Sequence, residues 1–121
     1  MSTPASAESN RDGHTILQLL LNVPQLAQYY HFDERPERLP LKIANVTAVD
    51  FGSATLLAAG KPAILTRSRD DQAFEITACD FRSNRAEIRF LYPVEGLIGQ
   101  ATFKKVEDRW SVDQIEVGEG K

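Results

Sequence analysis

Hydrophobic residues follow two different periods along the 121-residue chain, and the change falls near residue 40. Before that point apolar residues recur every three or four positions, which is the spacing of one face of an α-helix. These residues are Ile16, Leu19, Leu20, Val23, Leu26, Ala27 and Tyr30. From Leu41 onward apolar and polar residues alternate and turn residues recur, which is typical of β-strands. The pattern predicts a helical segment followed by strands near 41–50, 54–59, 62–68, 73–82, 85–92, 97–106 and 109–117.

Pro24 interrupts the helical pattern. The segment 15–18 has the form of a capping box, in which a hydroxyl and an amide satisfy free N–H groups at the start of a helix. A proline inside a continuous helix costs about 3 kcal/mol, whereas the first position of a new helix tolerates it well. We therefore expect a helix over 15–22, a break, and a second helix over 24–31. A single helix kinked at Pro24 is the alternative.

The links between successive strands are short, which predicts antiparallel neighbours, because a parallel crossover needs a dozen residues or more. In the last strand the apolar parity changes between Val112 and Ile115, and a β-bulge near residues 113–114 would restore it. Phe74 and Phe81 also differ in parity, which predicts a bend in strand 73–82 or cover on both of its faces. The sequence thus predicts an α+β domain in which the helical segment packs on a curved antiparallel β-meander.

This order of elements resembles the cystatin-like or NTF2-like arrangement, in which a curved sheet wraps around a helix. The resemblance covers most of residues 15–117 and rests on element order alone. A small β-barrel closed by the helix is the alternative architecture. Residues 1–13 are small and polar without a period, so we expect a mobile tail before a single domain over 14–117. Residues 118–121 are expected to form a polar C-terminal tail.

Composition narrows the function only a little. The chain is 42% hydrophobic and 26% charged, as globular domains are. Its formal net charge of −3 argues against nucleic-acid binding, because counterion release needs a basic surface. The longest apolar run, over 16–23, is too short to span a membrane. Cys79 is the single cysteine, which suits a cytoplasmic location. Residues 45–47 have the form of a glycosylation sequon, which matters only in a secreted eukaryotic protein.

Aromatic residues crowd the end of the predicted second helix. Adjacent helical residues point about 100° apart, so Tyr29, Tyr30 and His31 cannot all face one partner. Tyr30 continues the apolar stripe and is predicted to be core. His31 lies in the last turn, where free carbonyl groups favour a cation. Packing is the favoured interpretation, and Tyr29 and His31 are the candidates for a contact patch, since tyrosine is enriched in interfaces.

Asp80 shares the parity of Phe74 and Ile76, so it would be buried if that face were core. A buried carboxyl group has a raised pKa. In folds resembling the ketosteroid isomerases, a pocket acid and a tyrosine hydroxyl move protons. Asp80 with Tyr92 or Tyr30 is therefore the candidate pair for such a site. The alternatives are that a bulge turns Asp80 outward, or that it pairs with a neighbouring arginine (Arg82 or Arg85).

Other chemistry is weakly indicated. Cys79 lies in a predicted strand with no positive charge before Arg82, which favours an inert thiol over a nucleophile. His14 and His31 lack the spacing of metal ligands. The C-terminal "GEGK" lacks the hydroxyl residue and the helix of a phosphate-binding loop. We expect no metal and no cofactor.

The sequence favours a non-enzymatic binding module over an enzyme. Contact would be with a protein partner or a second copy through the sheet face, because a long meander leaves one face and two edges open. By analogy, small acidic domains of this kind include bacterial immunity proteins that neutralise toxins, and adaptors. The alternative function is a small-molecule-binding or isomerase-type domain with a pocket between helix and sheet.

Overall fold

The computed structural model describes residues 5–47, 49, 51–52, 55–67 and 73–119, with the backbone alone for 5–11. The helices are α1 (Ala5–Leu21), α2 (Pro24–Ala27) and two short 3-10 helices, η1 (Pro36–Arg38) and η2 (Pro93–Glu95). The strands are β1 (Leu41–Asn45), β2 (Leu56–Ala58), β3 (Lys61–Thr66), β4 (Phe74–Phe81), β5 (Arg85–Tyr92), β6 (Leu97–Val106) and β7 (Arg109–Glu119).

The helix break at Pro24 is confirmed, since Pro24 opens α2 and Val23 before it has extended backbone. α1 begins at Ala5, so residues 5–13, for which a mobile tail was expected, are helical. Alanine, glutamate and arginine in this segment are good helix formers. Residues 118–119 extend β7 rather than beginning a tail. The remaining residues of the predicted tails, 1–4 and 120–121, lie outside the described residues.

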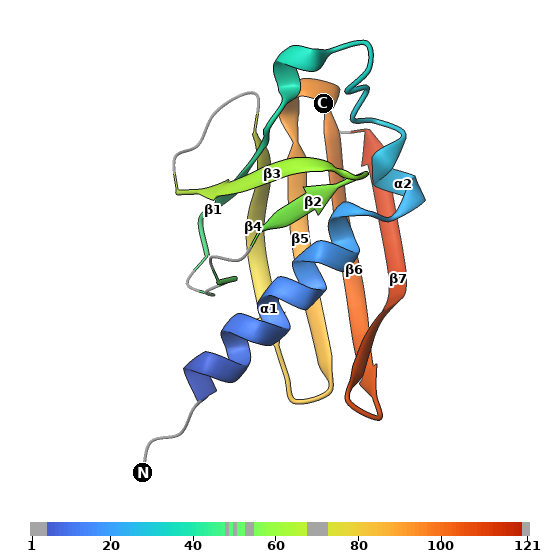
Figure 1. Cartoon of the computed structure of the whole chain (residues 1–121). Coiled ribbons are helices and arrows are strands. Elements are labelled where there is room, and N and C mark those ends of the chain that lie inside the picture. Colours follow the sequence, from blue (N-terminus) through green and yellow to red (C-terminus); the bar gives the residue numbers. More distant parts are fainter. Residues whose placement is uncertain (1–4, 48, 50, 53–54, 68–72, 120–121) are drawn as a thin grey trace.

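The seven strands form one curled mixed sheet in the order β2-β3-β1-β4-β5-β6-β7 (Figure 1). The α+β class and the curved sheet packed on a helical segment are confirmed, and β4 to β7 form the predicted antiparallel meander. A bulge at Asp113 in β7, which the apolar parity predicts, is also present. β1 differs from the prediction, because it runs parallel to both β3 and β4. Short links constrain only strands that follow one another, whereas β1 pairs with two strands that come later in the chain.

α1 lies across the apolar face of the curled sheet and contacts both edge strands, β2 and β7 (Figure 1). Its buried side carries Ile16, Leu17, Leu20 and Leu21. The predicted stripe contains Ile16 and Leu20 of these, whereas its Leu19 is only partly buried. The helix therefore fills the gap that the curling sheet leaves between its first and last strands.

Polar side chains at the end of α1, and Asn22 directly after it, pair with the backbone of the edge strand β2 and of Ala59 beside it. The Gln18 carboxamide accepts a hydrogen bond from the Leu57 N–H at 3.0 Å and donates to the Leu57 carbonyl. The Asn22 carboxamide accepts from the Ala59 N–H at 2.9 Å and donates to the Leu57 carbonyl at 3.0 Å. Residues four apart share one face of a helix, so α1 takes the place that a further strand would occupy at this edge.

Aromatic side chains fill the space between α1 and the sheet. Phe74 stacks on Phe90 with ring centroids 5.1 Å apart. The Tyr92 ring lies 5.9 Å from Phe74 and edge-on to Tyr30 at 6.1 Å. The prediction that Tyr30 is core is confirmed, and its hydroxyl donates to the Leu21 carbonyl at 2.8 Å, at the helix break.

Gly99 in β6 is required by the ring of Phe90 on the neighbouring strand. A Cβ atom at position 99 would overlap that ring and would lie 2.8 Å from the Glu116 carbonyl oxygen. The missing side chain lets the Phe90 ring lie against the sheet, and close packing of this kind excludes larger residues.

A bulge in β4 decides which of its side chains face α1. The pairing with β5 shifts between Ile76 and Ala78, so Thr77 is the extra residue. Beyond the bulge, Cys79 and Phe81 take the inward face and Asp80 the outward face. The bulge explains why Phe74 and Phe81 both contribute to the core although their sequence parity differs.

Substitution of the α1 amides should loosen β2 residue by residue. Gln18→Ala is expected to speed hydrogen exchange of the Leu57 amide about fivefold and to affect the Ala59 amide much less, because one side-chain hydrogen bond contributes about 1 kcal/mol. Asn22→Ala should have the reverse effect on the two amides. NMR-detected exchange of both amides tests this, and equal exchange in the two variants would contradict it.

Candidate functional site

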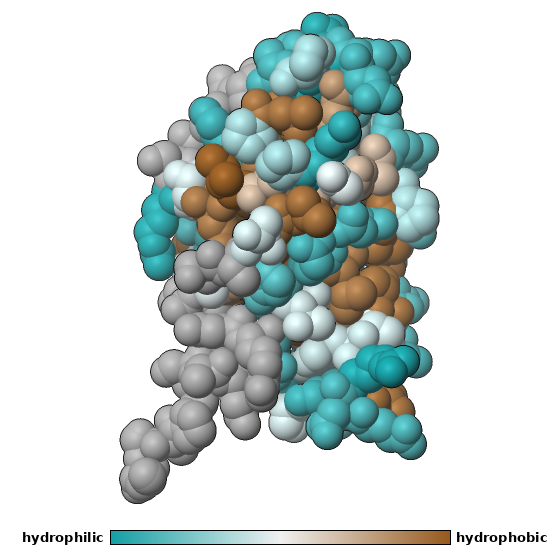
Figure 2. Space-filling view, in the orientation of Figure 1, coloured by the Kyte–Doolittle hydropathy of each residue, from teal (hydrophilic) through white to brown (hydrophobic). Residues whose placement is uncertain are grey.

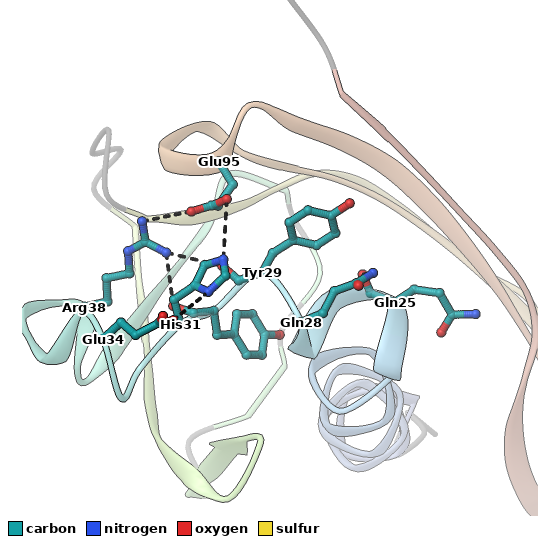
Figure 3. Close-up of polar contacts among 8 residues, drawn as sticks. Gln25, Gln28, Tyr29, His31, Glu34, Arg38 and Glu95 are labelled. Carbon is teal, nitrogen blue, oxygen red and sulfur yellow. Dashed lines mark hydrogen bonds and ion pairs between the residues drawn. The ribbon is translucent and has the colours of Figure 1, made fainter.

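His31 lies between two carboxylates at the end of the helical segment. Its backbone has φ 55°, in the left-handed region that histidine tolerates better than most residues. α2 ends at Ala27, so the second helix is shorter than the predicted 24–31. Residues 29–30 continue as turns closed by i→i−3 hydrogen bonds, and His31 ends them. The imidazole Nδ1 lies 3.2 Å from Glu34 Oε1, and Nε2 lies 3.9 Å from Glu95 Oε1 (Figure 3).

The Arg38 side chain links the end of the helical segment to η2. Its guanidinium Nη1 donates to the carbonyls of Tyr29 and Tyr30 at 3.2 and 3.0 Å, where the helical segment ends. Its Nη2 lies 2.9 Å from Glu95 Oε2, and the Arg38 side chain is only 9% exposed (Figure 3). We call His31, Glu34, Arg38 and Glu95 the Arg38 clamp. Its side chains contact one another and two backbone carbonyls of the helical segment, so the clamp holds the segment before β1 against η2.

Three of the four predicted site residues lie at or beside the clamp. His31 belongs to it, and the Tyr29 carbonyl accepts one of its hydrogen bonds while the Tyr29 ring packs against the core. Tyr92 is fully buried among aromatic rings. Burial raises the pKa of the Tyr92 hydroxyl, and the nearby Arg38 charge offsets part of that rise. The rings of Tyr29 and Tyr92 therefore pack against or within the core, and the contact role of Tyr29 stays a prediction.

Asp80, the fourth predicted residue, lies apart from the others. Its carboxylate is 60% exposed and lies 3.4 Å from Arg82 Nη2. The alternative in which a bulge turns Asp80 outward therefore describes the structure. The acid–tyrosine pair does not form, because Asp80 faces outward whereas Tyr92 and Tyr30 are buried on the inner side of the sheet.

Cys79 faces inward beside Asp80. Burial, and secondarily the charge of Asp80, raise the pKa of the Cys79 thiol to about 12. The thiol is therefore neutral at physiological pH, and a neutral thiol is a poor nucleophile.

The two histidines lack the spacing of metal ligands, and His14 instead contacts the backbone near β2. Among the described residues, no group of three or more His, Cys, Asp or Glu side chains is placed to hold a metal ion. His14 Nε2 lies 3.0 Å from the Thr55 carbonyl, which continues the line of Gln18 and Asn22 along β2.

The glycosylation-type motif is folded into a turn. Asn45 is buried, and its amide nitrogen donates to the Val49 carbonyl at 2.8 Å. Its side-chain oxygen accepts from the Thr47 N–H at 2.9 Å, as in an Asx turn. The nitrogen that a glycan would need is therefore engaged inside the protein.

A broad hollow of about 630 Å³ lies on the outer face of the sheet, opposite α1. Two aliphatic side chains, Leu91 and the 52% exposed Ile98, lie beside charged Arg89 and Glu116. We call this hollow the outer-face groove; its other lining residues are Thr77, Phe90, Gly99, Gln100, Val117 and Gly118. The sequence pattern did not predict this hollow. Its signal is that Leu91 and Ile98 are apolar residues at positions whose neighbours on the same face are polar.

A second hollow, of about 610 Å³, runs beside α1 toward β7. Its apolar lining comes from Leu19, Val23, Pro24 and Val112, and Figure 2 shows hydrophobic side chains gathered on this face of the molecule. This hollow lies at the surface between the helical segment and β7, whereas the interior between α1 and the sheet is filled by aliphatic and aromatic side chains. The predicted small-molecule pocket between helix and sheet stays a prediction.

Comparison of the chain with protein-family models, with curated proteins and with solved structures gives no match. Among the described residues, no helix is long and apolar enough to cross a membrane. The structure itself therefore defines the class, which is an α+β domain with a curled mixed sheet closed by a helix.

Removal of the central cation of the clamp should destabilise the fold. Arg38→Ala is expected to lower the free energy of unfolding by about 3 kcal/mol, because it removes the guanidinium in direct contact with the partly buried Glu95 carboxylate and with two backbone carbonyls. Arg35→Ala is the matched control, since the exposed pair of Arg35 and Glu37 contributes less than about 0.5 kcal/mol. Chemical denaturation measures both, and equal losses would contradict the structural role of the clamp.

The Cys79 thiol should react slowly with alkylating reagents. At pH 8 we expect native protein to react more than about a hundredfold more slowly than unfolded chain, because the thiol pKa is near 12 in the fold and about 8.5 in the unfolded state. The folded-state pKa is the higher one, so the stabilising contribution of this group is lost as pH rises above about 8.5. Rates followed from pH 7 to 10 test this; equal rates in the native and unfolded states would contradict it.

Proposed function

We propose that this chain is a non-enzymatic protein-binding module whose contact surface is the outer-face groove. The observation that carries the proposal is the placement of Ile98, more than half exposed, beside Leu91 in a hollow with Arg89 and Glu116 at its sides. Protein interfaces commonly combine an apolar centre with a polar rim, and arginine is enriched in them. Solvated faces of antiparallel sheets normally carry polar residues instead.

The ionisable groups of the chain support binding over catalysis. The Arg38 guanidinium is paired with Glu95 and two backbone carbonyls, Asp80 pairs with Arg82 at the surface, and the Cys79 thiol is held neutral. The interior is filled by aromatic rings, so a substrate would have to bind outside the core. A groove that binds another polypeptide needs none of these groups to react.

The proposal includes a cytoplasmic location and a partner other than nucleic acid. A single inward-facing thiol suits a reducing compartment. On the outer face, arginines alternate with acidic residues, as in the pairs Arg89–Glu87 and Arg85–Asp113, and this pattern lacks the continuous basic surface that nucleic acid selects.

Capture from a native lysate with matched variants tests the proposal. The tagged wild-type chain is expected to retain a polypeptide in stoichiometric amount, either another protein or untagged copies of itself. Ile98→Lys should reduce that capture at least tenfold, because it places a charge in the apolar centre of the groove. Gly118→Leu should also reduce it, since a Cβ atom at position 118 meets nothing within 4 Å and the new side chain would fill the groove without a clash.

Ile64→Lys is the matched control, because Ile64 in β3 is similarly exposed (46%) and lies outside the groove. It should leave capture unchanged. Thr15→Arg tests the hollow beside α1 in the same way. The proposal is overturned if Ile98→Lys and Ile64→Lys capture equally, or if only Thr15→Arg loses the partner.

A further inference from the structure

The outer-face groove is built from two rows of side chains that cross three neighbouring strands. Strand register aligns Leu91, Ile98 and Gly118 in the first row, from β5 through β6 to β7. The same register aligns Arg89, Gln100 and Glu116 in the second row. In each row the central residue belongs to β6. The two outer residues of the first row differ in size, a leucine and a glycine, and those of the second row differ in charge, an arginine and a glutamate.

Such rows complement a second copy of themselves. If two outer faces meet about a two-fold axis that runs along β6, then β5 of each copy lies over β7 of the other. Arg89 then faces Glu116 of the other copy, and this pair forms twice. Ile98 and Gln100 meet their own counterparts at the axis, as they must in an isologous contact.

The first row matches by size. Leu91 of one copy faces Gly118 of the other, where a Cβ atom would meet nothing within 4 Å. The glycine therefore provides an open place for the leucine side chain, and this pair also forms twice. Two leucines opposite each other, or two glycines, would give a clash or a void instead.

The second row matches by charge, and its present contacts within the chain are loose. Arg89 Nε lies 3.8 Å from Glu87 Oε2, and the Arg89 side chain is 62% exposed. Gln100 Nε2 donates to Glu116 Oε1 at 3.4 Å. Exposed pairs of this kind contribute little to folding, so both charges are free to change partners on docking.

The same two-fold rotation also limits how far the contact can extend along β6. Further along β6, Lys104 of one copy would approach Lys104 of the other, although Asp113 lies 3.8 Å from its amino group. Like charges at the axis disfavour contact at that end. A patch confined to two rows is small, so we expect association in the micromolar range or weaker.

From these matches we infer that the occupant of the outer-face groove is a second copy of this chain, docked about a two-fold axis along β6. The inference rests on the proposed function, because it names the partner of the same groove.

Charge reversal followed by sedimentation velocity tests the geometry. The wild-type chain should form a concentration-dependent dimer. Arg89→Glu should weaken dimerisation at least tenfold, since the introduced carboxylate would face that of Glu116 at both symmetry-related contacts, and Glu116→Arg should weaken it equally. An equimolar mixture of the two variants should dimerise to within about threefold of wild type, because every contact in the mixed dimer is again between opposite charges.

Arg85→Glu is the matched control, since it reverses the same charge on the same strand outside the groove. It should dimerise like wild type. The positions Arg89 and Glu116 are exposed, and thermal unfolding of each variant confirms that the fold is retained.

The inference is overturned if the wild type stays monomeric at millimolar concentration, or if mixing the two variants restores nothing. A monomer that still captures a different protein in an Ile98-dependent manner leaves the proposed function standing without this inference. A monomer with no capture that depends on Ile98 overturns both.

Discussion

The hydrogen bonds between α1 and the edge of β2 are the constraint on which the rest of the fold depends. A curled sheet that does not close into a barrel has two edges, and the unpaired backbone groups of an edge strand are open to pairing with another chain. Here His14, Gln18 and Asn22 supply side-chain partners to β2 from one face of the helix. The adjoining face of α1 inserts its leucines into the core. One helix thereby provides hydrogen-bond partners for the backbone of β2 and fills the concave side of the sheet with apolar side chains.

This closure determines where recognition can occur. With α1 seated against the sheet, the inner face is occupied by stacked aromatic rings, and Gly99 gives the Phe90 ring its space. At one end of the sheet, Arg38 and Glu95 are already paired with each other, and this pair joins the end of the helical segment to η2. The outer face of β5, β6 and β7 carries aliphatic and charged side chains whose contacts within the chain are long and exposed.

Single-residue bulges have a large influence on this division of faces. In a strand, one extra residue exchanges inward and outward positions for everything beyond it. The bulge at Thr77 places Cys79 inside and Asp80 outside, which removes the buried acid that simple alternation predicts. The bulge at Asp113 keeps Val112, Ile115 and Val117 against the core and leaves Glu116 on the outer face, in line with Gln100 and Arg89.

The sequence by itself determined the positions of the strands, the helix break at Pro24 and the bulge in β7, because each follows from local periodicity or from the geometry of a single residue. It also placed Tyr30 in the core. Only the tertiary structure decided that β1 lies between β3 and β4, that polar residues of α1 serve β2, and that Asp80 faces outward. It alone aligned Arg89 with Glu116 and Leu91 with Gly118. Register between distant strands depends on how the whole sheet packs, and periodicity within one strand carries no information about its neighbour.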